Sequence, residues 1–207
     1  MKTRMIFLIT LLATLGACAK SSSGNSNDTN DIQSVGKQLV IGNWKDTCKT
    51  WGSGDQLSSG YTTASFAEST VVFVGENYKS TDCTGEKTSS MKMTFSFEIP
   101  SRSSLGANVF DFNTTPRNVV YIISDQDTVN VMNTLAYCGF TDWVVGVEKD
   151  ITGKSCFIGP KSGEVIYSVM KITETQLQLG EPDDSHSGKT PEQRHVQFAS
   201  QSFIKIQ

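Results

Sequence analysis

Few side chains of this chain are spaced for catalysis. Residues 89–92 (Ser-Ser-Met-Lys) match the S-x-x-K spacing of acyl-serine enzymes, but they lead directly into an alternating apolar pattern and lack the companion motifs of those enzymes. His186 lies in a loop rich in Pro, Asp and Ser, and His195 lies beside Arg194, so neither has neighbours suited to a catalytic triad or a metal centre. We expect both histidines on the surface, and we expect a protein that is not an enzyme and binds no cofactor and no metal.

The N-terminus carries a targeting signal. Lys2 and Arg4 precede an apolar run over residues 5–13, which has the length of a signal-peptide core and is too short for a membrane span. The run ends in residues 15–18 (Leu-Gly-Ala-Cys), which resemble the bacterial lipoprotein signal, where small residues precede a cysteine that is diacylated before cleavage. This resemblance implies a signal peptide over residues 1–17 and a lipidated Cys18 in a bacterial cell envelope. An ordinary secretory signal is the alternative.

The residues after Cys18 bear on location and domain boundaries. The sorting rule that comes with the lipoprotein resemblance assigns retention at the inner membrane to an Asp after the cysteine, and Ala19 stands there. We therefore expect anchoring in the outer membrane, facing the periplasm or the cell surface. Residues 18–37 are rich in Ser, Asn and Gly and are predicted to form a flexible tether. Residues 38–207 are predicted to form the folded domain.

The remaining cysteines suit an oxidising compartment. Acylation of Cys18 leaves an even set of four, which predicts two disulfides in an exported protein. We favour Cys48 with Cys83 and Cys138 with Cys156, since each bond closes a modest loop between neighbouring segments. The other two pairings stay open. A zinc site is disfavoured because the spacings are wide and contain no C-x-x-C pair.

The charge balance limits the partners. The 18 basic and 21 acidic residues give a formal net charge of −3. This charge offers no basic field to neutralise phosphates, so nucleic acid is not an expected partner. The expected partner is a membrane, contacted through the lipid anchor. The oligomeric state stays open.

From residue 38 onward, apolar residues alternate as in β-strands. The clearest alternation covers residues 91–99, whose apolar side chains at every second position share one face. Similar patterns cover eight further segments: 39–48, 61–66, 70–78, 108–112, 118–123, 164–172, 176–179 and 195–206. Turn-forming residues separate them, including residues 113–116. So many short strands predict an all-β antiparallel fold, with a barrel or a β-sandwich as the leading architectures.

Residues 127–137 depart from the strand pattern. Val129, Met132, Leu135 and Ala136 stand at helical spacing after Asp127, which is suited to cap a helix. We predict one short helix here, although the alternation of Val129 with Val131 also fits a strand.

The first predicted strand contains Gly42 and Trp44 in a G-x-W motif. This motif resembles the signature of lipocalins and related ligand-binding barrels, and the resemblance spans about residues 38–207. It implies an up-and-down β-barrel in which the tryptophan lies in the closed base and a C-terminal arginine packs over it. By its place in the chain, Arg194 is the matching arginine. One departure is that the family usually has its helix after the eighth strand, whereas the helix predicted here precedes the last three strands.

Two functions fit such a barrel. In the first, the barrel is hollow and binds a small hydrophobic or amphipathic molecule without catalysis, with Met91, Met93, Phe95 and Phe97 among the lining residues. In the second, the same face is a solid core, and exposed loops act in adhesion, inhibition or another interaction at the cell envelope. An enclosed pocket of roughly a few hundred Å³ favours the first function, and a filled interior favours the second.

Overall fold

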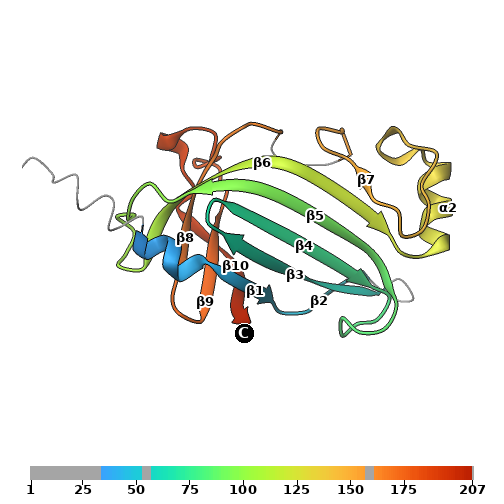
Figure 1. Ribbon diagram of the computed structural model, residues 1–207, viewed down its shortest axis with the longest axis horizontal. Coiled ribbons are helices and arrows are strands. Elements are labelled where there is room, and N and C mark those ends of the chain that lie inside the picture. The colour runs from blue at the N-terminus through green and yellow to red at the C-terminus, as the bar shows by residue number, and fades with distance from the viewer. Residues whose placement is uncertain (1–33, 53–56, 157–160, 207) are drawn as a thin grey trace, which may run out of the picture.

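The computed structural model describes residues 34–52, 57–156 and 161–206. Within them, eight antiparallel strands follow one another around a closed barrel (Figure 1). The barrel strands are β1 (Gly42–Asp46), β3 (Ser58–Ala67), β4 (Thr70–Tyr78), β5 (Lys87–Glu98), β6 (Val109–Ile123), β8 (Ile166–Ile172), β9 (Gln176–Glu181) and β10 (Gln197–Ile206). Strand β1 pairs with both β3 and β10, which closes the barrel. The predicted all-β up-and-down barrel is therefore confirmed, and the β-sandwich alternative is wrong.

Shorter elements complete the described fold. Strand β2 (Lys49–Trp51) pairs with β3, and β7 (Lys149–Asp150) pairs with β6. Helix α2 (Gln126–Thr134) and the 3₁₀ turn η2 (Tyr137–Gly139) lie between β6 and β7, before the last three barrel strands as predicted. The turn η3 (Pro191–Gln193) precedes β10. Residues 34–40 are also helical, so the described chain has two short α-helices where the sequence predicted one.

The helix at residues 34–40 corrects two boundaries. The strand expected over 39–48 begins only at Gly42. Residues 34–37, which the sequence assigned to the tether, are folded, because Val35 and Leu39 pack against the barrel core. A Cβ on Gly36 would approach Ile99 to 3.1 Å, so the helix lies close to the barrel. The folded domain therefore begins before residue 38.

Strand β6 corrects a second expectation. Residues 108–112 and 118–123 were predicted as separate strands with a turn at 113–116, but they belong to one strand of 15 residues. Pro116 lies opposite Phe95 at a shift in the register between β5 and β6. A bulge of this kind accommodates a proline because the ladder is already interrupted there. The proline therefore marks a bend within a long strand instead of a turn between two short ones.

The end of the barrel beside residues 34–40 is here called the base, and it is filled with apolar side chains. Trp44 is completely buried there, and its indole Nε1–H donates a hydrogen bond of 2.7 Å to the carbonyl of Val40. Around it lie the other buried residues of the base cluster: Val40, Ala64, Phe66, Val71, Phe95, Phe97, Ile99, Phe110, Phe112, Met170, Ile172, Leu177 and Phe203. The base is therefore a solid core.

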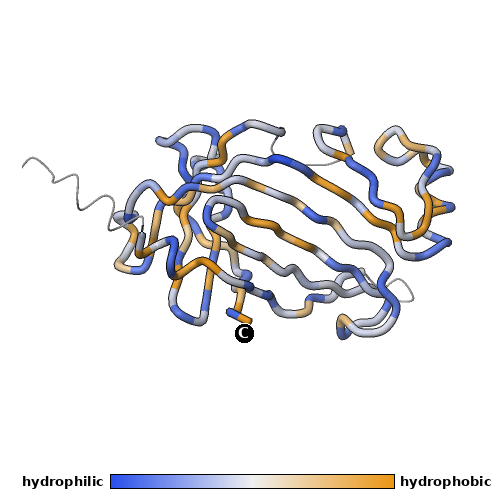
Figure 2. Tube along the Cα trace, viewed as in Figure 1, coloured by the Kyte–Doolittle hydropathy of each residue, from blue (hydrophilic) through white to orange (hydrophobic). Residues whose placement is uncertain are grey.

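The opposite end, here called the mouth, is partly covered by residues 126–156, the α2 segment. Figure 1 shows α2 and the helix at 34–40 at opposite ends of the molecule, and Figure 2 shows hydrophobic stretches on β4, β6 and the α2 segment. The Asp125 carboxylate accepts a bond of 3.0 Å from the Thr128 amide and caps α2, so the cap is not Asp127, which lies in the first turn of the helix. Trp143 is buried with Val129 in a second cluster, whereas Leu135 lies past the helix end and is exposed.

Two disulfides hold loops at the mouth. They join Cys48 to Cys83 and Cys138 to Cys156, which is the pairing that the sequence favours. The first ties the link between β1 and β2 to the loop between β4 and β5, and the second closes the α2 segment on itself. Both bonds therefore fix segments that surround the mouth of the barrel.

Removing the second bond is expected to destabilise the protein. Its cysteines are 18 residues apart in sequence, and chain entropy alone predicts a loss of about 3 kcal/mol in the free energy of unfolding for a loop of that length. Urea unfolding of the Cys138→Ser, Cys156→Ser double variant measures this loss. Non-reducing peptide mapping of the wild type is the control, and a Cys48–Cys156 peptide in that map would contradict the pairing.

Candidate functional site

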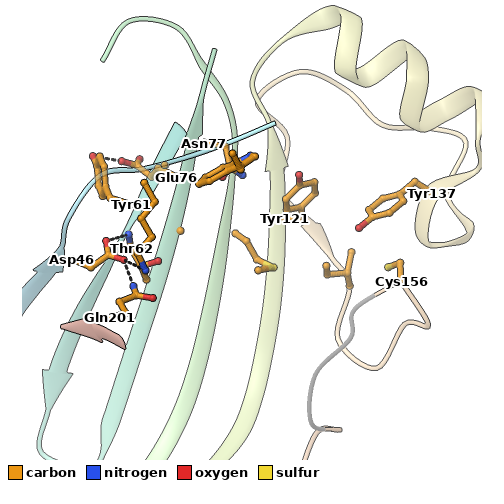
Figure 3. Close-up of a pocket in the computed structure, with 15 residues that line it drawn as sticks. Asp46, Tyr61, Thr62, Glu76, Asn77, Tyr121, Tyr137, Cys156 and Gln201 are labelled. Atoms are coloured by element: carbon orange, nitrogen blue, oxygen red, sulfur yellow. Dashed lines mark hydrogen bonds and ion pairs between the residues drawn. The ribbon is translucent and has the colours of Figure 1, made fainter. Parts of the chain in front are cut away.

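A pocket of about 540 Å³ opens at the mouth of the barrel, between the sheet β3–β6 and the α2 segment (Figure 3). Its lining combines aromatic, apolar and charged residues from almost every element around the mouth. They are Asp46, Lys49, Trp51, Gly60, Tyr61, Thr62, Gly75, Glu76, Asn77, Met91, Tyr121, Tyr137, Ile151, Cys156 and Gln201. The volume lies within the range typical of small-molecule sites.

The strand register explains why the barrel is open here and filled below. Thr62, Gly75, Met91 and Tyr121 stand in one row across β3 to β6 and face inward. Strand β4 contributes only a hydrogen atom to this row, and a Cβ on Gly75 would have no heavy atom within 4 Å. In the next row toward the base, Phe73 occupies the equivalent place on β4 and packs against the base cluster. The change from Phe73 to Gly75 therefore marks the floor of the pocket.

One wall of the pocket is aromatic and apolar. Tyr121 projects from β6 toward Tyr137 of the α2 segment, and their ring centroids are 6.3 Å apart (Figure 3). Met91 and Ile151 complete this wall. Burial raises the pKa of the Tyr121 hydroxyl, so Tyr121 is neutral at physiological pH. This wall suits the hydrophobic part of a ligand.

The facing wall is polar and is centred on Asp46, whose side chain is 2% exposed. The pairing of β1 with β3 ends at Lys45 and Thr63. Beyond this pair, the Asp46 carboxylate accepts the hydrogen bond that a backbone carbonyl of a further strand partner would have accepted. Its Oδ1 accepts a bond of 2.5 Å from the Thr62 amide, and its Oδ2 accepts a bond from the Gln201 side chain (Figure 3). Burial raises the pKa of Asp46 and outweighs the opposing effects of the Thr62 amide and Lys49.

A second carboxylate at the pocket, Glu76, is fully paired. It accepts hydrogen bonds of 2.5 Å from the Tyr61 hydroxyl and 3.0 Å from the Tyr78 hydroxyl, and the ammonium of Lys87 lies 3.0 Å away. Burial acts to raise its pKa, but the hydrogen bonds from Tyr61, Lys87 and Tyr78 together lower it. Glu76 is therefore an ionised carboxylate whose charge is neutralised within the protein.

Comparison with known proteins adds no assignment. No known protein family matches the chain, and no curated protein matches its sequence. In the described ranges, no helix is long and apolar enough to cross a membrane. The same ranges contain no group of three or more His, Cys, Asp or Glu side chains placed to hold a metal ion. The pocket is therefore the feature of the described chain that bears most directly on function.

The structure divides the predicted lining residues between two regions. Met91 lines the pocket, and Met93 packs between the base cluster and the cluster around Trp143. Phe95 and Phe97 do not line it, because they are buried in the base among other phenylalanines. The inner face of β5 spans the whole barrel, so only its mouth half meets the pocket. Of the four residues expected to line a cavity, only Met91 does so, and the expectation is wrong for Met93, Phe95 and Phe97.

At the base, one contact that the lipocalin resemblance implies, Arg194 over Trp44, is wrong. Trp44 and Gly42 lie where the resemblance places them, but the cation over Trp44 is Lys205, with its Nζ 5.1 Å from the ring centroid. Lys205 pairs with Trp44 across β1 and β10. Trp44 lies beside the C-terminal end of β10, whereas Arg194 precedes the N-terminal end of that strand. Arg194 instead donates hydrogen bonds of 2.8 Å to the Asn113 side chain and 2.7 Å to the Ser168 carbonyl.

The two histidines also differ from expectation. His186 is partly exposed and its Nδ1 lies 2.9 Å from Asp183, but His195 is buried, with its Nδ1 3.1 Å from the Ser168 hydroxyl. Gly188 has a φ of +72°, and a Cβ there would lie 2.4 Å from His195 Nε2. The loop before β10 is therefore packed around His195, which the sequence placed on the surface.

The residues that sequence reasoning missed are those of the polar wall and the tyrosines. One signal for Asp46 was available, since it follows Gly42 and Trp44 at the same alternation and a carboxylate on that inner face is unusual. Gln201 gave no such signal, because its place beside Asp46 depends on the pairing of the first barrel strand with the last, in which Asp46 stands opposite Phe203. Cys18, the signal peptide and most of the tether lie outside the described residues.

Proposed function

We propose that this protein is a lipid-anchored, non-catalytic binding protein of the lipocalin type, which holds a small amphipathic molecule in the pocket at the mouth of its barrel. The observation that carries the proposal is the pocket of about 540 Å³, which has an apolar wall at Tyr121 and Tyr137 and a polar wall at Asp46. Walls of opposite character suit a ligand with one apolar part and one polar part.

Although the base is filled, the barrel does not fit the alternative of an interaction module with a solid core throughout. The base cluster around Trp44 gives the barrel a rigid end, while the row that contains Gly75 leaves the mouth open. A domain that acted only through its outer loops would have no need of this opening. The proposal therefore assigns separate roles to the two halves of the barrel, stability to the base and binding to the mouth.

The location is part of the same proposal. The lipoprotein signal at residues 15–18 supports attachment through Cys18, and Ala19 supports the outer membrane. The two disulfides suit an oxidising compartment outside the cytoplasm. Residues 19–33 would then separate the barrel from the membrane surface.

Filling the pocket is expected to weaken binding strongly without harming the fold. In Gly75→Leu, the new side chain enters the open space in front of β4, and replacing a glycine within a strand removes a residue that weakens strands. The neutral fluorophore N-phenyl-1-naphthylamine is the probe, and its fluorescence titration should show saturable binding to the wild type. We expect binding to Gly75→Leu to be weaker by about tenfold or more.

The matched control is Val74→Leu. Val74 is the neighbour of Gly75 on β4 and pairs with Thr63, outside the row that faces the pocket. This variant should bind the fluorophore as the wild type does, with an unchanged melting temperature. Equal binding by the wild type and Gly75→Leu would contradict the proposed site.

A further inference from the structure

The charged side chains around the pocket differ in how closely each is paired with an opposite charge. Among the described lining residues, the charged side chains are Asp46, Glu76 and Lys49. Glu76 is neutralised by Lys87 and two tyrosine hydroxyls. Lys49 lies 3.8 Å from Asp46 Oδ2, beyond hydrogen-bond distance, and its side chain is 45% exposed. Asp46 therefore carries a buried negative charge whose nearest cation is loosely held.

The Asp46 carboxylate also keeps acceptor capacity for another donor. An ionised carboxylate offers about four lone-pair positions, and the Thr62 amide and the Gln201 side chain supply its two hydrogen bonds in the described chain. The Thr62 amide belongs to the strand backbone, so it fixes the carboxylate in one orientation. A ligand ammonium would meet an acceptor that is already positioned, and the loss of side-chain entropy on binding would be small.

The opposite wall suits the rest of a cationic ligand. Tyr121 and Tyr137 present rings across the pocket from Asp46 (Figure 3). Met91 lies in the same row as Tyr121. Trp51, which is partly exposed, stands beside Gly60 at the rim. Aromatic faces attract cations as well as apolar groups, whereas an anionic ligand would meet the charge of Asp46.

We propose that the ligand is an organic amine, with its ammonium bound to the Asp46 carboxylate in place of Lys49 and its apolar body against Tyr121 and Tyr137. This inference deepens the proposed function and rests on it. It also assigns Lys49 a role, since an exposed lysine beside Asp46 would occupy the ammonium position until a ligand displaces it.

Three indole probes of similar shape separate charge from apolar contact: tryptamine (cationic), tryptophol (neutral) and indole-3-propionate (anionic). Isothermal titration of the full chain should show tryptamine binding about ten- to a hundred-fold more tightly than tryptophol, the range typical of a hydrogen bond to a charged group. Indole-3-propionate should bind most weakly.

The decisive variant is Asp46→Asn. The asparagine keeps an oxygen for the Thr62 amide, and the Gln201 amide can turn to accept from the new NH₂ group. Tryptamine should then bind no more tightly than tryptophol, while the affinity for tryptophol stays unchanged and shows that the pocket is intact. Lys49→Met is the matched control, and its effect on the affinity for tryptamine should be opposite to that of Asp46→Asn. It should tighten tryptamine binding because the competing cation is gone.

Other results would overturn the inference. A wild type that binds tryptophol or indole-3-propionate as tightly as tryptamine, or an Asp46→Asn variant that keeps its preference for tryptamine, would exclude Asp46 as an ammonium site. Failure of all three probes to bind would also overturn the inference. The proposed function is judged separately, by the titration of the wild type and Gly75→Leu with the neutral fluorophore.

Discussion

Replacing Trp44 with Ala is expected to lower the free energy of unfolding by about 3–5 kcal/mol. The indole is completely buried at the base, so its removal loses apolar burial and leaves a cavity among rigid neighbours. It also removes the donor to the Val40 carbonyl, which joins β1 to the helix at residues 34–40. Urea unfolding followed by circular dichroism measures the loss.

The coupling of Trp44 to its cation can be tested in the same experiment. In a double-mutant cycle, Trp44→Ala and Lys205→Met should show an interaction energy of about 0.5–2 kcal/mol, because the Lys205 ammonium lies over the indole ring. Arg194→Ala is the control, and it should be additive with Trp44→Ala since Arg194 bonds to Asn113 and Ser168 instead. Coupling to Arg194 and none to Lys205 would contradict the structure of the base.

Replacing Cys18 with Ser is expected to move the whole protein from the membrane to the soluble fraction. Each buried methylene of an acyl chain contributes about 0.8 kcal/mol to membrane binding, so the proposed lipid chains would outweigh any contact between the barrel and the membrane surface. The described fold begins at residue 34, well after Cys18. The melting temperature of the variant should therefore equal that of the wild type.

Detergent phase partitioning and cell fractionation measure this change. Ala19→Asp is the matched control, because it keeps Cys18, the proposed lipidation site, and by the lipoprotein sorting rule should move the protein to the inner membrane. A Cys18→Ser variant that still partitions into detergent would contradict lipid anchoring at this residue.

The fold could be predicted from the sequence because alternation is a local property of each strand. Residues 91–99 show which face is buried without reference to any other segment, and turn residues separate most of the strands. Pro116 misled the prediction, since a proline at a bulge and a proline at a turn look alike when the partner strand is unknown. The helix at residues 34–40 was missed because the polar composition of residues 18–37 suggested a tether throughout.

The candidate site was harder to predict because it depends on distant pairings. Met91 was found from the pattern of its own strand. Gly75 gains its role only from its neighbours across the sheet, and Gln201 lies near Asp46 because β1 pairs with β10 so that Asp46 stands opposite Phe203. The assignment of Arg194 failed for the same reason, since its place in the chain does not show which end of β10 reaches Trp44.

The central claim is that the mouth pocket holds a small molecule, and native mass spectrometry of the soluble Cys18→Ser protein tests it most directly. The protein should be purified from its own cells without denaturant and compared with the same protein carrying Gly75→Leu. We expect a complex heavier than the polypeptide by the mass of one small molecule, and we expect this complex to be absent when residue 75 is leucine. A wild-type pocket that yields only the mass of the polypeptide, or an adduct that survives in Gly75→Leu, would contradict the account.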